Sequence, residues 1–155
     1  MDIELIMDTI ETTIKSFLPS YIEEMNIKKG DSLIADFVTE SYLKYRLPGG
    51  GIMPNFAIFF LQYLIGPFDV TSLNQATAIN YNIAIDTVVN VSAEQNSADE
   101  RRLIRYQTIM RKIIENEVMS LMESNMQIKE SDLSFGKSGN GNMFGISQFV
   151  LSVTI

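Results

Sequence analysis

The alternating stretch TAINYNIAIDTVVNVSA, residues 77–93, constrains the fold more than any other part of the chain. Its apolar positions alternate with polar or small ones, first at Tyr81, Ile83 and Ile85 and then at Val89 and Val91. A period of two predicts a β-strand that turns one face to a hydrophobic core and the other face, with Asp86, outward. Because the stretch is longer than a typical strand, we expect it to project beyond the body of the domain.

The N-terminal segment shows the three- and four-residue spacing of an amphipathic helix. Its apolar residues are Ile3, Ile6, Met7, Ile10, Ile14, Phe17 and Leu18. Asp2 is the expected N-cap, and Pro19 is expected to end the helix or to start another turn. A turn at 26–31 and a short helix at 32–47 are expected to follow. PGGG at 48–51 is then a break that neither a helix nor a central strand can continue through.

A second and longer helix is predicted at 96–124. Ser97 and Glu100 have the spacing of a capping box at its start, and Asn125 is a suitable C-terminal stop. The predicted buried stripe consists of Leu103, Tyr106, Ile109, Met110, Ile113, Ile114, Val118, Leu121 and Met122.

Three further segments predict strands. NFAIFFLQYL at 55–64, bounded by Pro54 and Gly66-Pro67, has the length and aromatic content of a strand buried on both faces, although a buried helix is an alternative. Shorter strands are expected at 126–135 and 146–155.

The order of these elements indicates an α+β fold. We expect a single, mostly antiparallel sheet, with a long helix and an N-terminal helix packed on one face. The whole chain, 1–155, is predicted to be a single domain, with a variable insertion at 26–52 and a flexible hairpin loop at 136–145.

The chain contains neither cysteine nor histidine. Disulfides, thiolate nucleophiles and Cys-bound zinc are therefore excluded, as are Ser-His-Asp and Cys-His catalysis within one chain. We predict that the protein is not an enzyme and holds no cofactor or metal. An enzyme that uses carboxylates or lysine, with Asp86 as its first candidate, is the third-ranked hypothesis.

The charge and the hydropathy pattern argue against nucleic-acid-binding, secreted and membrane-spanning proteins. A formal net charge of −7 disfavours a sequence-independent grip on nucleic acid, which needs an excess of Lys and Arg. The N-terminus has acids among its first residues and lacks the apolar core of a signal peptide. The longest apolar run, around 56–65, is too short to span a bilayer. We expect a cytosolic protein without a membrane partner.

The segment FGKSGNGNMFG at 135–145 contains Gly136, Lys137 and Ser138, which match the end of a nucleotide-binding P-loop. A P-loop also needs glycine where this chain has Ser131, and a helix directly after the motif. Neither condition is met, so we predict a flexible hairpin connection, since Asn and Gly accept positive φ.

Two groups of residues are candidate contacts to another subunit or partner. The glycine-rich segment contributes Lys137, Asn140, Met143 and Phe144, of which the last two are alternatively core residues at the start of a strand. The 96–124 helix carries several cations, which are either partners of acids one turn away or contacts to an acidic neighbour. Arg101 and Arg105 are the candidates from this helix.

The element pattern resembles the tail-terminator (tail-completion) proteins of tailed bacteriophages. It comprises the leading amphipathic helix, the long two-strand stretch, the helix that opens SADERRLIRYQTIMRKIIENEV, and a terminal strand pair that ends in FVLSVTI. The resemblance covers roughly 1–155 and lies in the order and length of elements, without a diagnostic motif. The insertion at 26–52 with its PGGG loop departs from the pattern.

The resemblance implies a structural virion protein without catalytic residues. Such a protein forms a homo-oligomeric ring, commonly a hexamer, that caps the tail tube and joins it to the head-side connector. DNA would only pass through the ring lumen, and the ring would be assembled in the host cytoplasm. A head–tail adaptor, a stopper, another tail-tube-related ring protein and a small non-catalytic protein-binding module are the alternatives.

Overall fold

The computed structural model describes residues 2–31, 44–45, 58–73, 76–91, 96–122, 125–137 and 143–155. Its helical elements are α1 (Ile3–Lys29), α2 (Asn96–Ile113), a π-helical turn η2 (Ile114–Val118) and α3 (Met119–Leu121). Its strands are β1 (Lys44–Tyr45), β2 (Ile58–Leu73), β3 (Ala76–Val91), β4 (Asn125–Lys137) and β5 (Met143–Thr154).

The strands form one sheet in the order β1-β2-β3-β5-β4. All neighbouring pairs are antiparallel except β1 with β2. The predicted α+β class with a mostly antiparallel sheet is therefore confirmed. β4 lies at one edge of the sheet, and β3 lies at its centre between β2 and β5.

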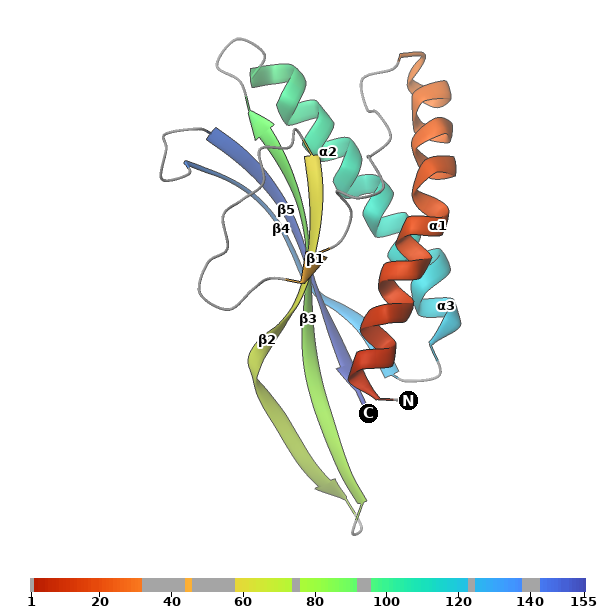
Figure 1. Ribbon diagram of the computed structural model, residues 1–155, viewed down its shortest axis with the longest axis vertical. Helices are drawn as coiled ribbons and strands as arrows, with labels where there is room; N and C mark the ends of the chain where they lie inside the picture. The colour runs from red at the N-terminus through yellow and green to blue at the C-terminus, as the bar shows by residue number, and fades with distance from the viewer. Residues whose placement is uncertain are drawn as a thin grey trace.

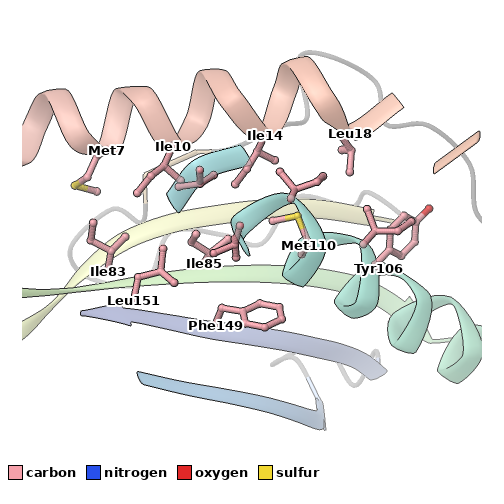
Figure 2. Close-up of a cluster of buried hydrophobic side chains, with 14 of the residues drawn as sticks. Met7, Ile10, Ile14, Leu18, Ile83, Ile85, Tyr106, Met110, Phe149 and Leu151 are labelled. Carbon is pink, nitrogen blue, oxygen red and sulfur yellow. The ribbon is translucent and has the colours of Figure 1, made fainter. Parts of the chain in front are cut away.

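The hydrophobic core lies between the sheet and the helices α1 and α2, which cover the same face of it (Figure 1). Figure 2 shows the α1 side chains directed toward those of β3, β5 and α2. The labelled core residues are Met7, Ile10, Ile14, Leu18, Ile83, Ile85, Tyr106, Met110, Phe149 and Leu151. Each fully buried large aliphatic side chain of this kind contributes about 1.5–3 kcal/mol relative to its exposed state.

α1 is longer than predicted. The Asp2 carboxylate accepts a hydrogen bond from the Leu5 amide at 2.8 Å, which confirms the predicted N-cap. Of the two expectations for Pro19, an end of the helix is wrong and a further turn is found, because the buried stripe continues beyond Pro19 through Ile22 and Met25. The core contact of this extra length offsets the backbone hydrogen bond that proline cannot donate. The helix ends only at Gly30, whose φ of 68° is the left-handed conformation that favours glycine.

The second predicted helix is confirmed, with a changed register near its end. α2 begins at Asn96, one residue before the predicted cap Ser97, and the helical path continues through η2 to Leu121. A π-turn adds one residue to a helical turn and so shifts the buried face. Val118 stays buried and Met122 packs against the core, whereas Leu121 is 56% exposed. The prediction that Leu121 belongs to the buried stripe is therefore wrong.

The strand interpretation of 55–64 is confirmed from Ile58 onward, but the strand does not stop at Gly66-Pro67. The pairing with β3 shifts register between Ile65 and Asp69 and then resumes as far as Leu73. A bulge of this kind is one of the places where a sheet accommodates proline. The expected burial of both faces is wrong at Leu64, which is exposed.

The helix predicted at 32–47 is wrong at Lys44–Tyr45, where the chain forms strand β1 instead. The rest of that prediction and the PGGG break at 48–51 lie outside the described residues.

β2 and β3 continue beyond the other strands as a two-stranded ribbon, here called the arm, which consists of residues 66–73 and 76–81. β5 follows β3 only as far as Asn80, opposite Thr154. In Figure 1 the arm extends past the first turn of α1 and away from the helices. The expectation that the long strand projects beyond the body of the domain is therefore confirmed.

Polar contacts join α1 and the residues at its end to the helical segment that follows β3. The Tyr21 hydroxyl donates to Glu117 Oε1 at 2.8 Å. The Arg105 guanidinium donates to both carboxylate oxygens of Asp31, at 2.6 and 3.1 Å, and this hydrogen-bonded pair raises the pKa of Arg105. Both contacts lie in the C-terminal part of α1 and just beyond it, where they add to the apolar packing of α1 against α2 and η2.

Tyr21→Phe is expected to lower the free energy of unfolding by about 0.5–1.5 kcal/mol at neutral pH, because one hydrogen bond to Glu117 is lost. Burial raises the pKa of Tyr21 above its ordinary value of 10.0, and the hydrogen bond to Glu117 raises it further against an opposing hydrogen bond with Asn116. A raised folded-state pKa gives stability that is complete below pH 10.0 and is lost as the pH rises through the folded value.

The difference between the parent protein and Tyr21→Phe should therefore shrink above pH 10. Urea unfolding of both proteins from pH 7 to pH 11 measures this, and the subtraction removes the titration of other groups. A difference that stays constant or grows above pH 10 would contradict the assigned hydrogen bond.

Candidate interaction surface

Within the described residues, the structure presents surfaces rather than a ligand-sized cavity. A crevice between α1 and α2, lined by Tyr21, Met25, Ile109 and Lys112 among others, encloses about 10 Å³. That is room for about one water molecule. The described part of the chain contains no group of three or more carboxylates placed to hold a metal ion.

The glycine-rich segment joins two antiparallel strands, as predicted, but the connection is shorter than 136–145. Lys137 is the last residue of β4 and pairs with Met143, the first residue of β5. Asn140 lies outside the described residues, as do the side chains of Lys137 and Met143. The Phe144 side chain is half-buried, so whether these four residues contact a partner stays a prediction.

Two glycines of this hairpin have close neighbours that leave little room for a side chain. A Cβ atom on Gly136 would lie 3.0 Å from Cζ of Phe144, the residue opposite it in the sheet. A Cβ atom on Gly145 would lie 2.9 Å from Cδ2 of Leu103 on α2 and 3.0 Å from Cε1 of Phe135 on β4. The absence of these side chains lets the Phe144 ring cover Gly136 and lets α2 approach the hairpin. Gly136, the glycine of the P-loop-like triplet, thus serves packing.

The two arginines proposed as partner contacts, Arg101 and Arg105, have different environments in the structure. Arg105 is held by Asp31 within the chain, so a partner that uses its guanidinium must share or replace that carboxylate. Arg101 is exposed on the first turns of α2. Its contact with a partner stays a prediction.

Asp86 lies on the predicted side of β3 but is not exposed to solvent, which corrects the expectation of an outward-facing residue. The residue is 6% exposed, and its carboxylate accepts hydrogen bonds from the Tyr63 hydroxyl at 3.0 Å and from Gln148 Nε2 at 2.9 Å. Gln148 Nε2 also donates to the Tyr63 oxygen at 3.0 Å. Alternation in the sequence identifies the face of a strand, but it cannot tell whether that second face is covered. The three side chains tie β2, β3 and β5 together.

The arm carries exposed apolar residues that the sequence analysis did not single out. Val70 is 64% exposed and Phe68 is 41% exposed, and Leu64 at the base of the arm is also exposed. The Phe68 ring lies against Tyr81, with ring centroids 4.8 Å apart. Gly66-Pro67 suggested the end of a strand, so these residues were not assigned to a strand pair. The length of the 77–93 stretch could have revealed this strand pair, because a strand of that length needs a partner strand of similar length.

The outer edge of β4 is a second surface. β4 pairs with β5 on one side, and none of the described strands pairs with it on the other. Leu133 and Phe135 are 37% and 48% exposed on this strand. An edge strand with unpaired N–H and C=O groups can accept a strand from another chain.

No protein-family model and no curated protein sequence matches this chain. No helix among the described residues is both long and apolar enough to cross a membrane. The two exposed surfaces, the arm and the outer edge of β4, are therefore the observations from which a function can be argued.

Proposed function

We propose that this protein is a structural subunit of a tailed-bacteriophage virion. In this proposal it forms a homo-oligomeric ring, as a tail terminator or neck subunit, that joins the tail tube to the head-side connector. The projecting arm, whose apolar side chains no described helix covers, is the observation that carries the proposal. The resemblance of the element order to that of tail-terminator proteins supports the same proposal.

The arm is difficult to explain in a protein that works as a monomer. An isolated two-stranded ribbon is marginally stable in water. Here such a ribbon also exposes Phe68 and Val70. Covering these two side chains with another surface would lower the free energy of the system. Burial in an assembly would both stabilise the arm and remove this apolar surface from water.

A ring requires two different surfaces on each subunit, because a rotational head-to-tail contact joins unlike patches. The arm and the outer edge of β4 are two such surfaces on one chain. The proposal assigns no catalytic role and no cofactor. DNA passes through the lumen without specific contacts, in keeping with the net charge of −7.

Multi-angle light scattering on the purified protein tests the proposal. We expect a single species whose mass is a fixed multiple of 17.5 kDa, with rings visible in negative-stain micrographs. The assembly is expected to bind isolated tail tubes or head-side connectors. A monomer at all concentrations that also fails to bind either structure would refute the proposal. Binding to connectors alone would favour a head–tail adaptor or stopper of the same architecture.

A non-catalytic protein-binding module is the second candidate, and the open edge of β4 favours it. Strand addition at one edge needs a single partner strand and no ring. This candidate predicts a monomer that forms a one-to-one complex, so the mass measured in the same scattering experiment separates the two functions.

A further inference from the structure

The apolar face of the sheet continues onto the arm beyond the end of the helices. Leu64 pairs with Ile83, and Val70 pairs with Ile79, so these side chains share the face that the helices cover farther along β3. Tyr81 pairs with the core residue Val153 and holds the Phe68 ring on the same face. α1 begins at Ile3, at the base of the arm, and does not extend over it (Figure 1). The arm thus presents a strip of core-like surface without its cover.

The outer edge of β4 presents apolar residues on the same face of the sheet. Leu133 pairs with Ser147, and Phe135 pairs with Gly145, against which Leu103 of α2 packs. The first half of β4 is poorly suited to accept a strand, because a register shift lies between Ile128 and Glu130. Bulges and charged residues are devices that keep sheet edges from pairing. The accepting part of the edge is therefore 131–136.

One chain cannot bring these two surfaces together. Val70 lies opposite Ile79 of β3, while Phe135 belongs to the end of the sheet where Gly145 lies opposite Val89. Ten residues along a strand place the two surfaces about 33 Å apart. No described element of the same chain covers either surface, which leaves both available to another molecule.

Charge distinguishes the two ends of the molecule. The sequence has no Lys or Arg in 2–14 or 58–91, the segments that form the first half of α1 and the β2–β3 pair. Exposed acids at this end are Asp2, Glu4, Asp8 and Asp69. At the opposite end, the last turns of α1 and the start of α2 carry the cations Lys28, Lys29, Arg101, Arg102 and Arg105 together with the acids Glu23, Glu24, Asp31, Asp99 and Glu100. Two arm ends would bring like charges together, whereas the arm end of one copy meets cations at the opposite end of another.

We propose that the arm of one copy packs across the 131–136 edge of β4 and the start of α2 in a second copy. The Phe68 and Val70 side chains cover Leu133 and Phe135, and the acidic arm end faces Arg101. The contact joins unlike surfaces, so it repeats around a ring or along a filament until it closes. This inference rests on the proposed homo-oligomer and names the two surfaces that build it.

Paired cysteines test the contact, because the chain has no cysteine of its own. The variant with both Val70→Cys and Phe135→Cys is treated with a short bismaleimide cross-linker and run on a denaturing gel. Both side chains are exposed, so neither substitution removes a core contact. We expect a ladder of covalent species up to the full ring, since every subunit then carries both halves of the link. Each single variant should stay monomeric on the gel.

A matched control pairs Phe135→Cys with Leu121→Cys, which is as exposed but lies outside both surfaces. It should give no ladder. Efficient dimers from Val70→Cys alone would show an arm-to-arm contact and overturn the inference, as would a ladder that stops at the dimer in the double variant.

Light scattering on the same samples separates the two proposals. A ring-sized mass without the Val70–Phe135 ladder overturns this inference and leaves the proposed oligomer standing. A monomeric mass in the parent protein overturns both.

Discussion

Leu103→Ala is expected to lower the free energy of unfolding by about 2–5 kcal/mol, the usual cost of truncating a buried leucine. Leu103 is 1% exposed, and its Cδ2 atom fills the space over Gly145, where a Cβ atom would come within 2.9 Å. No side chain on Gly145 can move in to refill the cavity. We therefore expect a loss toward the upper end of this range, measured by urea unfolding monitored by circular dichroism.

Leu121→Ala is the matched control on the same helical path. Leu121 is 56% exposed, and exposed positions without special contacts usually change stability by less than about 0.5 kcal/mol. The spacing of apolar residues alone predicts equal losses for the two leucines. Equal measured losses would mean that the π-turn at Ile114–Val118 does not rotate Leu121 out of the core.

Asp86→Ala is expected to lower the free energy of unfolding by about 1–3 kcal/mol. The Tyr63 hydroxyl loses its acceptor, while Gln148 keeps its hydrogen bond to the Tyr63 oxygen. The penalty comes mainly from the loss of these hydrogen bonds in a partly buried site. Asp86→Asn should cost less, because its amide oxygen can still accept one of the two hydrogen bonds.

Asp132→Ala is the control for this prediction. Asp132 lies opposite Gln148 on the other side of β5, on the same face of the sheet as Asp86, but it is exposed. We expect a change of less than about 0.5 kcal/mol, because an exposed carboxylate can be replaced by water. Similar losses for Asp86→Ala and Asp132→Ala in urea unfolding would show that the hydrogen-bonded cluster contributes nothing of its own.

The elements that sequence analysis located best are those whose periodicity is long. The alternation in 77–93 predicted both β3 and its projection, and the spacing from Leu103 to Val118 predicted the buried face of the second helix. Residues that locally disfavour regular structure led to wrong predictions of where an element ends, at Pro19 for α1 and at Gly66-Pro67 for β2. A proline marks only a preference of the local backbone, and burial of the residues beyond it can outweigh that preference.

The candidate contacts were located only in part. The sequence identified the hairpin around Gly136 and the cations of α2, but not the exposed pairs Phe68–Val70 and Leu133–Phe135. An apolar residue in a strand is expected inside, and its exposure depends on which helix lies over that position. No local pattern in the chain carries that information.

By itself, the sequence determined the α+β class, the long central strand, the two amphipathic helices and the exclusion of cysteine and histidine chemistry. These follow from side-chain period and residue type, which are local properties. Only the tertiary structure decided that the helices stop short of the arm, that Asp86 is buried against Tyr63 and Gln148, and that β4 is left at an edge. Those outcomes depend on the relative lengths and register of elements far apart in the chain, because cover, burial and edge position are set by neighbours in space.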